Sequence, residues 1–142
     1  MKFVHLLLIL PTIFFTMSCS SKDKIQQPVD TFVNGKRIIR FSGYDWVVES
    51  SANLKQGPGP NYFSNSTDNV WLDDAGRLHL RITNRNGKWY CAKVTLVNSY
   101  SHGRYIFRVD SRVDKLDKNV VAGLFTYKND SEEIDIEFSK WS

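Results

Sequence analysis

Apolar and polar residues alternate in short runs along most of the chain, and turn-forming residues separate these runs. Beyond residue 19, no segment repeats its apolar residues at the spacing of about 3.6 that an amphipathic helix requires. Alternation with a period of two is typical of strands with one buried face. The runs that predict strands are residues 37–41, 46–49, 70–73, 78–82, 89–97, 104–109, 120–127 and 132–138.

The segments between these runs carry turn signals. DAGR at 74–77 predicts a hairpin, and NRNG at 84–87 and NDS at 129–131 predict turns. GPGPN at 57–61 predicts a surface loop, because its prolines have no amide hydrogen. Strands at this spacing predict an all-β fold, an antiparallel β-sandwich, with no internal repeat.

Some residues of these strands are expected inside the sandwich. The run 120–127 is nearly continuously apolar, so we expect it to be covered on both faces. Trp46, Trp71 and Trp89 lie in strands, and we interpret them mainly as packing residues. Cys91 lies in an apolar stretch and is predicted to be a buried, inert thiol.

The first residues have the pattern of an export signal. Lys2 supplies a basic start, and an apolar run of about 13 residues extends from Phe3 to Phe15. A membrane-spanning helix needs about 20 residues, so this run has the length of a signal-peptide core. We therefore predict that residues 1–18 are a signal peptide and lie outside the folded domain.

The sequence TMSC at 16–19 resembles the cleavage box of bacterial lipoproteins, although Thr16 stands where an aliphatic residue is usual. It predicts that Cys19 is lipidated, that residues 19–30 form a polar tether, and that the protein is anchored in the membrane of the bacterial cell envelope. Each acyl CH₂ that enters the membrane contributes about 0.8 kcal/mol. The alternatives to lipidation are a simple secretory signal with an incidental Cys19 and a retained membrane anchor.

The amino-acid composition and charge exclude several classes of protein. The hydrophobic share of 42% and the aromatic share of 13% exclude a disordered or coiled-coil protein. Two cysteines exclude a disulfide scaffold and a multi-cysteine zinc site. Without Lys2 the chain has 18 basic and 15 acidic residues, hence a net charge of +3, and the charges are interspersed. We therefore predict no nucleic-acid partner.

The strand predicted at 132–138 carries three carboxylates on one face. Side chains alternate along a strand, so Glu133, Asp135 and Glu137 point the same way. The opposite face carries Ile134, Ile136 and Phe138, which we expect to pack into the core. By itself this pattern also describes a solvated acidic face or a cation-binding edge.

The spacing of the acids also suits glycoside hydrolysis. The Cα atoms of Glu133 and Glu137 are about 13 Å apart, from a rise near 3.3 Å per residue, and long side chains can bring the carboxyl groups closer. Retaining glycosidases need about 5–5.5 Å between the nucleophile and the acid. Asp135 between them can share a proton with one glutamate, because neighbouring carboxylates resist simultaneous ionisation.

The motif EIDIE at 133–137 resembles the active-site signature of glycoside hydrolase family 16, which includes endo-β-glucanases, laminarinases, agarases and carrageenases. Three further segments resemble this family: GRLHL at 76–80, SYSHGRYIFRV at 99–109 and NVVAGLFTY at 119–127. The similarity covers residues 41–141. It implies a concanavalin A-like jelly roll with a concave cleft, and a retaining mechanism on internal β-linkages of a polysaccharide.

The resemblance implies a role for each acid. Glu133 matches the nucleophile, Glu137 the general acid/base, and Asp135 the acid that assists the nucleophile. A single residue separates Asp135 from Glu137, which keeps the strand regular, whereas many laminarinases have two residues and a bulge. The polysaccharide and linkage, and the choice between hydrolysis and transglycosylation, are therefore left open. A structural calcium is known in the family, but no ligand cluster places one here, and no other cofactor is expected.

Two weaker candidates concern sugar binding. Trp141 can stack on a sugar ring or serve as a structural residue at a strand end. Asn61 can bind a sugar hydroxyl or simply form a turn. His102 is expected either on the surface or at the rim of the cleft. His79 is interpreted as non-catalytic.

Residues 31–142 are expected to form the N-terminal portion of the catalytic domain of this family. The chain stops five residues after Glu137, whereas members of the family continue with further strands. The chain is expected to be either a fragment of a longer protein or a truncated gene product, and, were it complete, we expect poor folding and little or no activity. A monomeric enzyme is the leading hypothesis. A non-catalytic carbohydrate-binding sandwich and an inactive truncated remnant are the alternatives.

Overall fold

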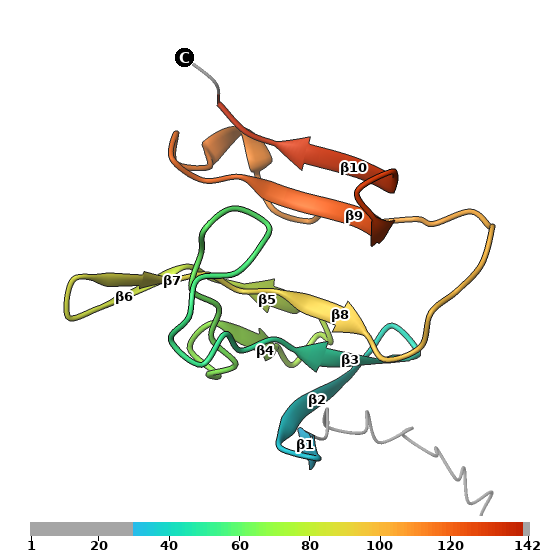
Figure 1. Cartoon of the computed structure of the whole chain (residues 1–142), viewed down its shortest axis with the longest axis horizontal. Coiled ribbons are helices and arrows are strands. Elements are labelled where there is room, and N and C mark those ends of the chain that lie inside the picture. Colours follow the sequence, from blue (N-terminus) through green and yellow to red (C-terminus); the bar gives the residue numbers. More distant parts are fainter. Residues whose placement is uncertain (1–29, 141–142) are drawn as a thin grey trace, which may run out of the picture. The chain divides into compact units, whose positions relative to one another are not determined.

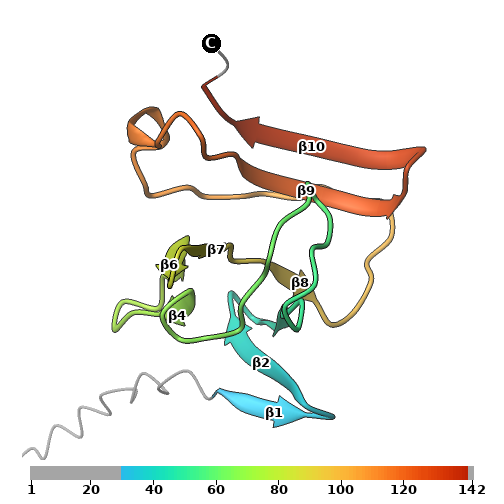
Figure 2. The same ribbon diagram turned by 60° about the vertical axis from the view of Figure 1, so that its left-hand side comes forward.

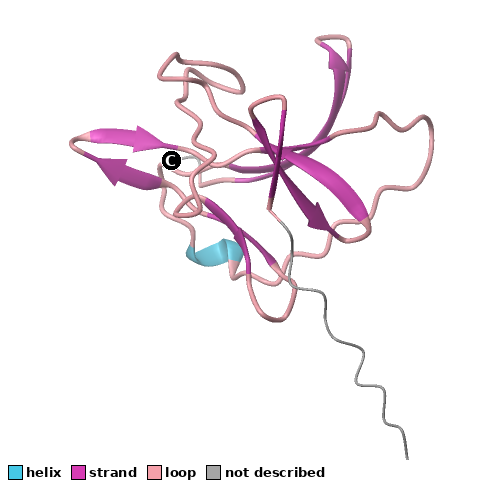
Figure 3. Ribbon diagram, turned by 90° about the horizontal axis from the view of Figure 1, so that it is seen from below, coloured by secondary structure: helices cyan, strands magenta, loops and turns pink. Residues whose placement is uncertain are grey.

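The computed structural model describes residues 30–140, which form two compact units, residues 30–98 and 99–140. The regular structure is almost entirely strand, with one short 3₁₀ helix, η1 (Val113–Lys115), in the second unit (Figure 3). All paired strands run antiparallel, so the predicted all-β antiparallel class is confirmed. The jelly-roll topology stays a prediction. The signal segment, Cys19 and Trp141 lie outside the described residues.

The largest sheet of the first unit has four strands (Figure 1). Its strands, in spatial order, are β1 (Thr31–Val33), β2 (Lys36–Phe41), β3 (Tyr44–Val48) and β8 (Val94–Leu96). Asn34 and Gly35 join β1 to β2 with positive φ angles of 50° and 75°. This pair of angles is that of a type I′ turn, whose twist matches a hairpin.

Alternation along β2 and β3 builds the core of this unit. Ile39 and Val48 are at most 2% exposed and cluster with Val70, which is fully buried. Val70 belongs to β4 (Val70–Leu72), which pairs with β5 (Leu78–Leu80) as the sequence predicts. Trp46 packs against the core, and its indole nitrogen donates to the carbonyl of Phe41 at 3.0 Å, so its predicted packing role is confirmed.

Two buried polar side chains, Arg37 and Asn69, form hydrogen bonds between the core and the neighbouring segments. Arg37 is 3% exposed and donates to the carbonyls of Asn65 and Val70, each at 2.9 Å. It also forms an ion pair with Asp30 at 2.7 Å. Asn69 is fully buried and contacts the segment that includes the hairpin β6 (Thr83–Arg85) and β7 (Lys88–Tyr90). Burial of these polar groups is tolerated because they are hydrogen-bonded.

The second unit is built around one hairpin (Figure 2). Its strands are β9 (Ala122–Asn129) and β10 (Glu132–Phe138), joined at the predicted turn. The predicted strand at 104–109 is wrong, because this segment has no strand partner within the described residues and runs as an irregular, exposed loop. Alternation favours a strand, but the strand needs a neighbour to satisfy its backbone groups.

The burial expected for three parts of the chain is also wrong. Alternate residues of β9 are exposed, so it is not covered on both faces. Ile134 and Ile136 are 72% and 49% exposed, and Phe138 is only partly buried, because a two-stranded hairpin has no apolar layer of its own to cover this face. Trp89 is 62% exposed because β6–β7 is likewise a separate two-stranded sheet.

Candidate functional site

The three acids of β10 lie on one face of an extended strand. Antiparallel pairing places Glu133 opposite Tyr127, Asp135 opposite Phe125 and Glu137 opposite Gly123. Residues that are directly opposite in a sheet share a face, so the two aromatic rings flank the acids. All three acids are exposed, and Phe125 and Tyr127 are 38% and 56% exposed. We call this surface, made of these five residues, the acidic face.

The turn between β9 and β10 sets the register that creates the acidic face. The pairing shifts between Glu132 and Glu133, so that Lys128 is left without a partner across the hairpin. The ammonium group of Lys128 instead bonds both carboxylate oxygens of Glu132, at 2.7 and 2.9 Å. This ion pair lowers the pKa of Glu132. Glu132 is thereby tied to the turn.

Glu133 lies in an unfavourable environment for a negative charge. Desolvation raises its pKa, and the charge of Asp135 and a hydrogen bond with that carboxyl group raise it further. Asp130 and Glu137 add smaller effects of the same sign. Two carboxyl groups can share a hydrogen bond only when one of them is protonated. These effects all favour the protonated form of Glu133, and Glu137 contributes to them only through its charge.

Tyr127 connects the acidic face to the turn. Its hydroxyl donates to Asp130 at 2.9 Å, and this bond raises its pKa, with a smaller contribution from the charge of Glu133. Sequence reasoning missed Tyr127 and Phe125 as site residues. The signal was present, since both occupy alternate positions of the 120–127 run, but the pairing register was needed to place them beside the acids.

Asn61 lies in the first unit, in the predicted loop 57–61. Its side-chain nitrogen donates to the carbonyl of Pro58 at 2.9 Å, and its backbone pairs with Gln56. These contacts are those of a turn-forming asparagine, the second of the two roles weighed from the sequence. His102 is exposed.

The hairpin β4–β5 carries a second group of polar residues. The Oδ2 atom of Asp73 accepts from Nε of Arg77 at 2.7 Å and lies 2.9 Å from Nε2 of His79. The His79 ring stacks on Trp71, with centroids 4.6 Å apart, and the Arg81 guanidinium lies 4.4 Å from the centre of the Trp71 ring. His79 therefore has a structural role here, as a bridge between Trp71 and Asp73.

The carboxylate of Asp73 should stabilise the first unit in a pH-dependent manner. Its hydrogen bonds, first of all with His79 and then with the Arg77 backbone, hold its pKa far below the usual range. A lowered pKa stabilises the fold above the unfolded value of about 3.9, and the effect is lost as the pH falls below it. Asp73→Asn is expected to lower Tm at pH 7, and the difference from the parent should shrink below about pH 4.

Thermal unfolding of both proteins between pH 2 and 8 measures this effect. The matched control is Asp74→Asn, which changes the exposed neighbouring acid. A Tm difference for Asp73→Asn that stays constant down to pH 2, or that equals the effect of Asp74→Asn, contradicts the prediction.

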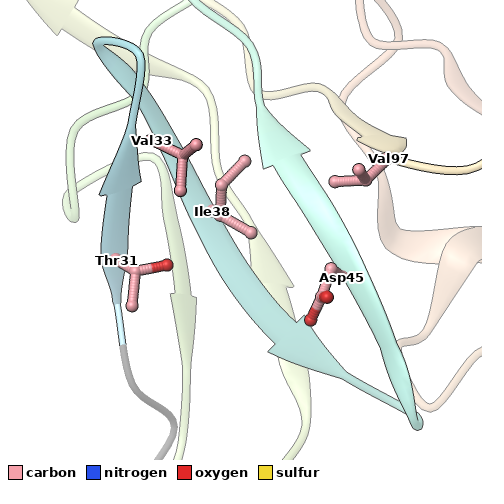
Figure 4. Close-up of a pocket in the computed structure, with 5 residues that line it drawn as sticks. All are labelled: Thr31, Val33, Ile38, Asp45 and Val97. Atoms are coloured by element: carbon pink, nitrogen blue, oxygen red, sulfur yellow. The ribbon is translucent and has the colours of Figure 1, made fainter.

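An open hollow of about 230 Å³ lies on the four-stranded sheet, on the face opposite the core. Figure 4 shows the side chains that line it, which are Thr31, Val33, Ile38, Asp45 and Val97. Its one charged group, Asp45, accepts a bond from Arg40 at 2.9 Å. The hollow is therefore mainly apolar and contains none of the residues predicted to be functional.

Within residues 30–140, no three histidine, cysteine or acidic side chains are arranged to hold a metal ion. Cys91 is half-buried rather than buried, and desolvation raises its pKa, so the thiolate is disfavoured. The same residues include no helix that has the length and apolarity for a membrane span.

Comparisons with known proteins identify no relative of this chain. No protein-family model matches the chain, and neither the curated proteins nor the solved structures contain a significant match.

Proposed function

We propose that the chain is the N-terminal portion of a retaining glycoside hydrolase that cleaves internal β-linkages of a polysaccharide, with a jelly-roll catalytic domain of the family 16 type. The observation that carries this proposal is the acidic face of β10. There, Glu133, Asp135 and Glu137 follow one another on one side of a regular strand, exposed to solvent and flanked by two aromatic rings.

In this mechanism, the carboxylate of Glu133 attacks the anomeric carbon while the carboxyl group of Glu137 protonates the departing glycosidic oxygen. The products of this step are a glycosyl ester on Glu133, a free chain end and ionised Glu137. Glu137 then removes a proton from water, which attacks the anomeric carbon and releases Glu133. Two inversions retain the anomeric configuration.

Asp135 has a defined part in this cycle. Desolvation first, and then the charge of Asp135 and its hydrogen bond with Glu133, raise the pKa of Glu133, which would oppose ionisation of a nucleophile. The difficulty is removed when the shared proton resides on Asp135, because Asp135 then donates to the Glu133 carboxylate and stabilises its charge. The same hydrogen bond orients the attacking oxygen.

The predicted lipid on Cys19 would localise this activity to the cell envelope. The tether of residues 19–30 would hold a monomeric catalytic domain at the bacterial cell envelope, where an extracellular polysaccharide is accessible. Residues that bind the sugar are proposed to include Phe125 and Tyr127, with Trp141 as a further stacking residue.

The stereochemistry of the product tests the proposal directly. Incubation of the protein with a panel of β-glycans is expected to release reducing ends, and proton NMR of the first product should show the β-anomer before mutarotation. Release of the α-anomer would contradict the assignment of Glu133 as a nucleophile, since an inverting enzyme activates water instead.

A non-catalytic carbohydrate-binding protein is the second candidate. The exposed rings of Phe125 and Tyr127 favour it, because ring stacking on sugars requires no ionisable group. In that case, calorimetry would detect binding to a polysaccharide with no release of reducing ends.

A further inference from the structure

A cluster of cationic and aromatic side chains lies in the first unit, apart from the hairpin β4–β5. We call it the lysine–tyrosine surface, and it consists of Lys55, Tyr62, Arg85, Lys88 and Tyr90. The ammonium nitrogen of Lys88 lies 3.7 Å from the centre of the Tyr62 ring and 5.5 Å from that of Tyr90. Lys55 approaches Tyr62 at 5.8 Å, and the Arg85 guanidinium approaches Tyr90 at 5.0 Å. Three cations thus share two rings.

The charge of this surface is not balanced by acids. The segments 50–67 and 82–98, from which it is built, contain no Asp or Glu. Elsewhere in the same unit, three arginines each pair with an aspartate: Arg37 with Asp30, Arg40 with Asp45 and Arg77 with Asp73. Among the described residues, no carboxylate pairs with Lys55, Arg85 or Lys88.

Two of these cations lie directly opposite each other. The register of β6 and β7 pairs Arg85 with Lys88. Like charges at opposed positions of a hairpin are destabilising, so the arrangement has an energetic cost that a bound anion would offset. Cation–π contacts with the tyrosines relieve part of this cost without neutralising the charge.

The cationic groups are held in place by neutral partners. Arg85 donates to the hydroxyl of Ser64 at 3.3 Å and, with its second terminal nitrogen, to the side-chain oxygen of the fully buried Asn69. Lys88 and the Tyr90 hydroxyl both donate to the side-chain oxygen of Asn53, at 3.3 and 3.0 Å. Groups that are fixed before binding lose little conformational entropy when a ligand arrives.

We propose that the lysine–tyrosine surface binds the acidic groups of an anionic polysaccharide, so that the polymer on which the protein acts carries carboxylates or sulfates. This inference rests on the proposed function for the nature of the polymer, and on the unbalanced cations for its charge. Lys55, Lys88 and Arg85 pair with the acidic groups, and the tyrosine hydroxyls supply hydrogen bonds to neighbouring sugar hydroxyls.

The geometry favours a polysaccharide over a nucleic acid. Proteins that bind single-stranded nucleic acids offer aromatic faces on which bases stack. Here the Lys88 ammonium group lies 3.7 Å from the centre of the Tyr62 ring, so that face is already covered. Pairing of ammonium groups with sugar acids requires no free ring face.

Binding is measured on the full chain carrying Glu133→Gln, so that no polymer is consumed. The probes are dextran sulfate with neutral dextran as its uncharged counterpart, and polygalacturonate with its methyl ester. We expect calorimetric binding to at least one anionic polymer and none to its neutral counterpart. The arm that binds identifies the acidic group as sulfate or carboxylate. Added salt should weaken the interaction.

Substitutions then assign binding to this surface. Lys88→Gln and Lys55→Gln are each expected to raise Kd about tenfold, which corresponds to about 1.4 kcal/mol. Lys36→Gln removes one charge from an exposed lysine of β2 and should change Kd less than twofold. Lys88→Arg keeps the charge and should restore most of the affinity, which separates lost charge from a disturbed fold.

Equal effects of Lys88→Gln and Lys36→Gln would overturn the inference. So would equal binding of neutral and anionic polymers, or tighter binding of a single-stranded oligonucleotide or an anionic lipid vesicle that depends on the same lysines. The proposed function fails separately: Lys88-dependent binding of an anionic polymer without any cleavage by the parent protein would contradict the hydrolase and leave this binding surface in place.

Discussion

Glu133→Gln is expected to abolish cleavage of the β-linked polysaccharide that the full-length protein accepts. The substitution keeps the size of the side chain but removes the anion that forms the glycosyl ester. A fall in kcat of more than about 10³-fold is expected, equivalent to more than about 4 kcal/mol of transition-state stabilisation. Release of reducing ends measures the rate, and calorimetry checks that substrate still binds.

The same strand supplies a matched control. Glu132 is the preceding residue and has the same carboxylate, but its side chain bonds to Lys128 at the turn rather than joining the acidic face. Glu132→Gln should therefore retain most of the activity. Equal loss in both variants would indicate a damaged hairpin, and full activity of Glu133→Gln would refute the nucleophile.

Glu137→Ala completes this test because it separates the role of the general acid/base from that of the nucleophile. Loss of a general acid/base costs about 10²–10⁴-fold. Azide needs no general base, so it should intercept the glycosyl ester and restore turnover in Glu137→Ala with a substrate that has a good leaving group. The product should be the β-glycosyl azide. Azide rescue of Glu133→Gln to the same product would contradict the assignment of the two glutamates.

Local patterns predict the parts of the fold that local interactions decide. β10 is found where period-two alternation and the turn at 129–131 place it. The hairpin β4–β5 follows from two alternating runs around Gly76, whose φ of 73° suits the turn. β1 was missed, although Asn34-Gly35 between two short apolar runs is a strong hairpin signal.

Partners that are distant in sequence limit what the pattern can show. Residues 104–109 alternate as well as β10 does, yet only β10 finds a neighbouring strand among the described residues of its unit. The orientation of the three acids follows from the strand alone and could be predicted. The rings beside them depend on the register with β9, and the lysine–tyrosine surface joins Tyr62 to Lys88 across 26 positions of the sequence.

Asn69→Ala is expected to cause the largest loss of stability in the first unit. Asn69 is fully buried, and its side-chain nitrogen lies 2.9 Å from the carbonyl of Arg81, 3.0 Å from that of Tyr90 and 3.1 Å from the Thr83 hydroxyl. Removal of the amide leaves these acceptors without a donor, at a cost of about 1–3 kcal/mol for each buried group. We expect the free energy of unfolding to fall by about 3–5 kcal/mol.

Such a loss is large beside the stability of about 5–15 kcal/mol that is typical of a native domain. Urea unfolding followed by the fluorescence of Trp46 and the other tryptophans measures it. Asn98→Ala, at an exposed position, is the matched control and should change the unfolding free energy by less than about 0.5 kcal/mol. A change of less than about 1 kcal/mol for Asn69→Ala would show that water replaces the lost donors.

Asn69 also links this stability to the proposed binding surface, because its side-chain oxygen accepts from Arg85. In Asn69→Ala, Arg85 loses that hydrogen bond and keeps its contacts with the Ser64 hydroxyl and the Tyr90 ring, so the cation opposite Lys88 is held less firmly. Under conditions where the variant remains folded, its affinity for an anionic polymer should therefore fall along with its stability. Asn98→Ala should change neither quantity, so a variant that loses stability but keeps full affinity would show that Arg85 does not need this anchor.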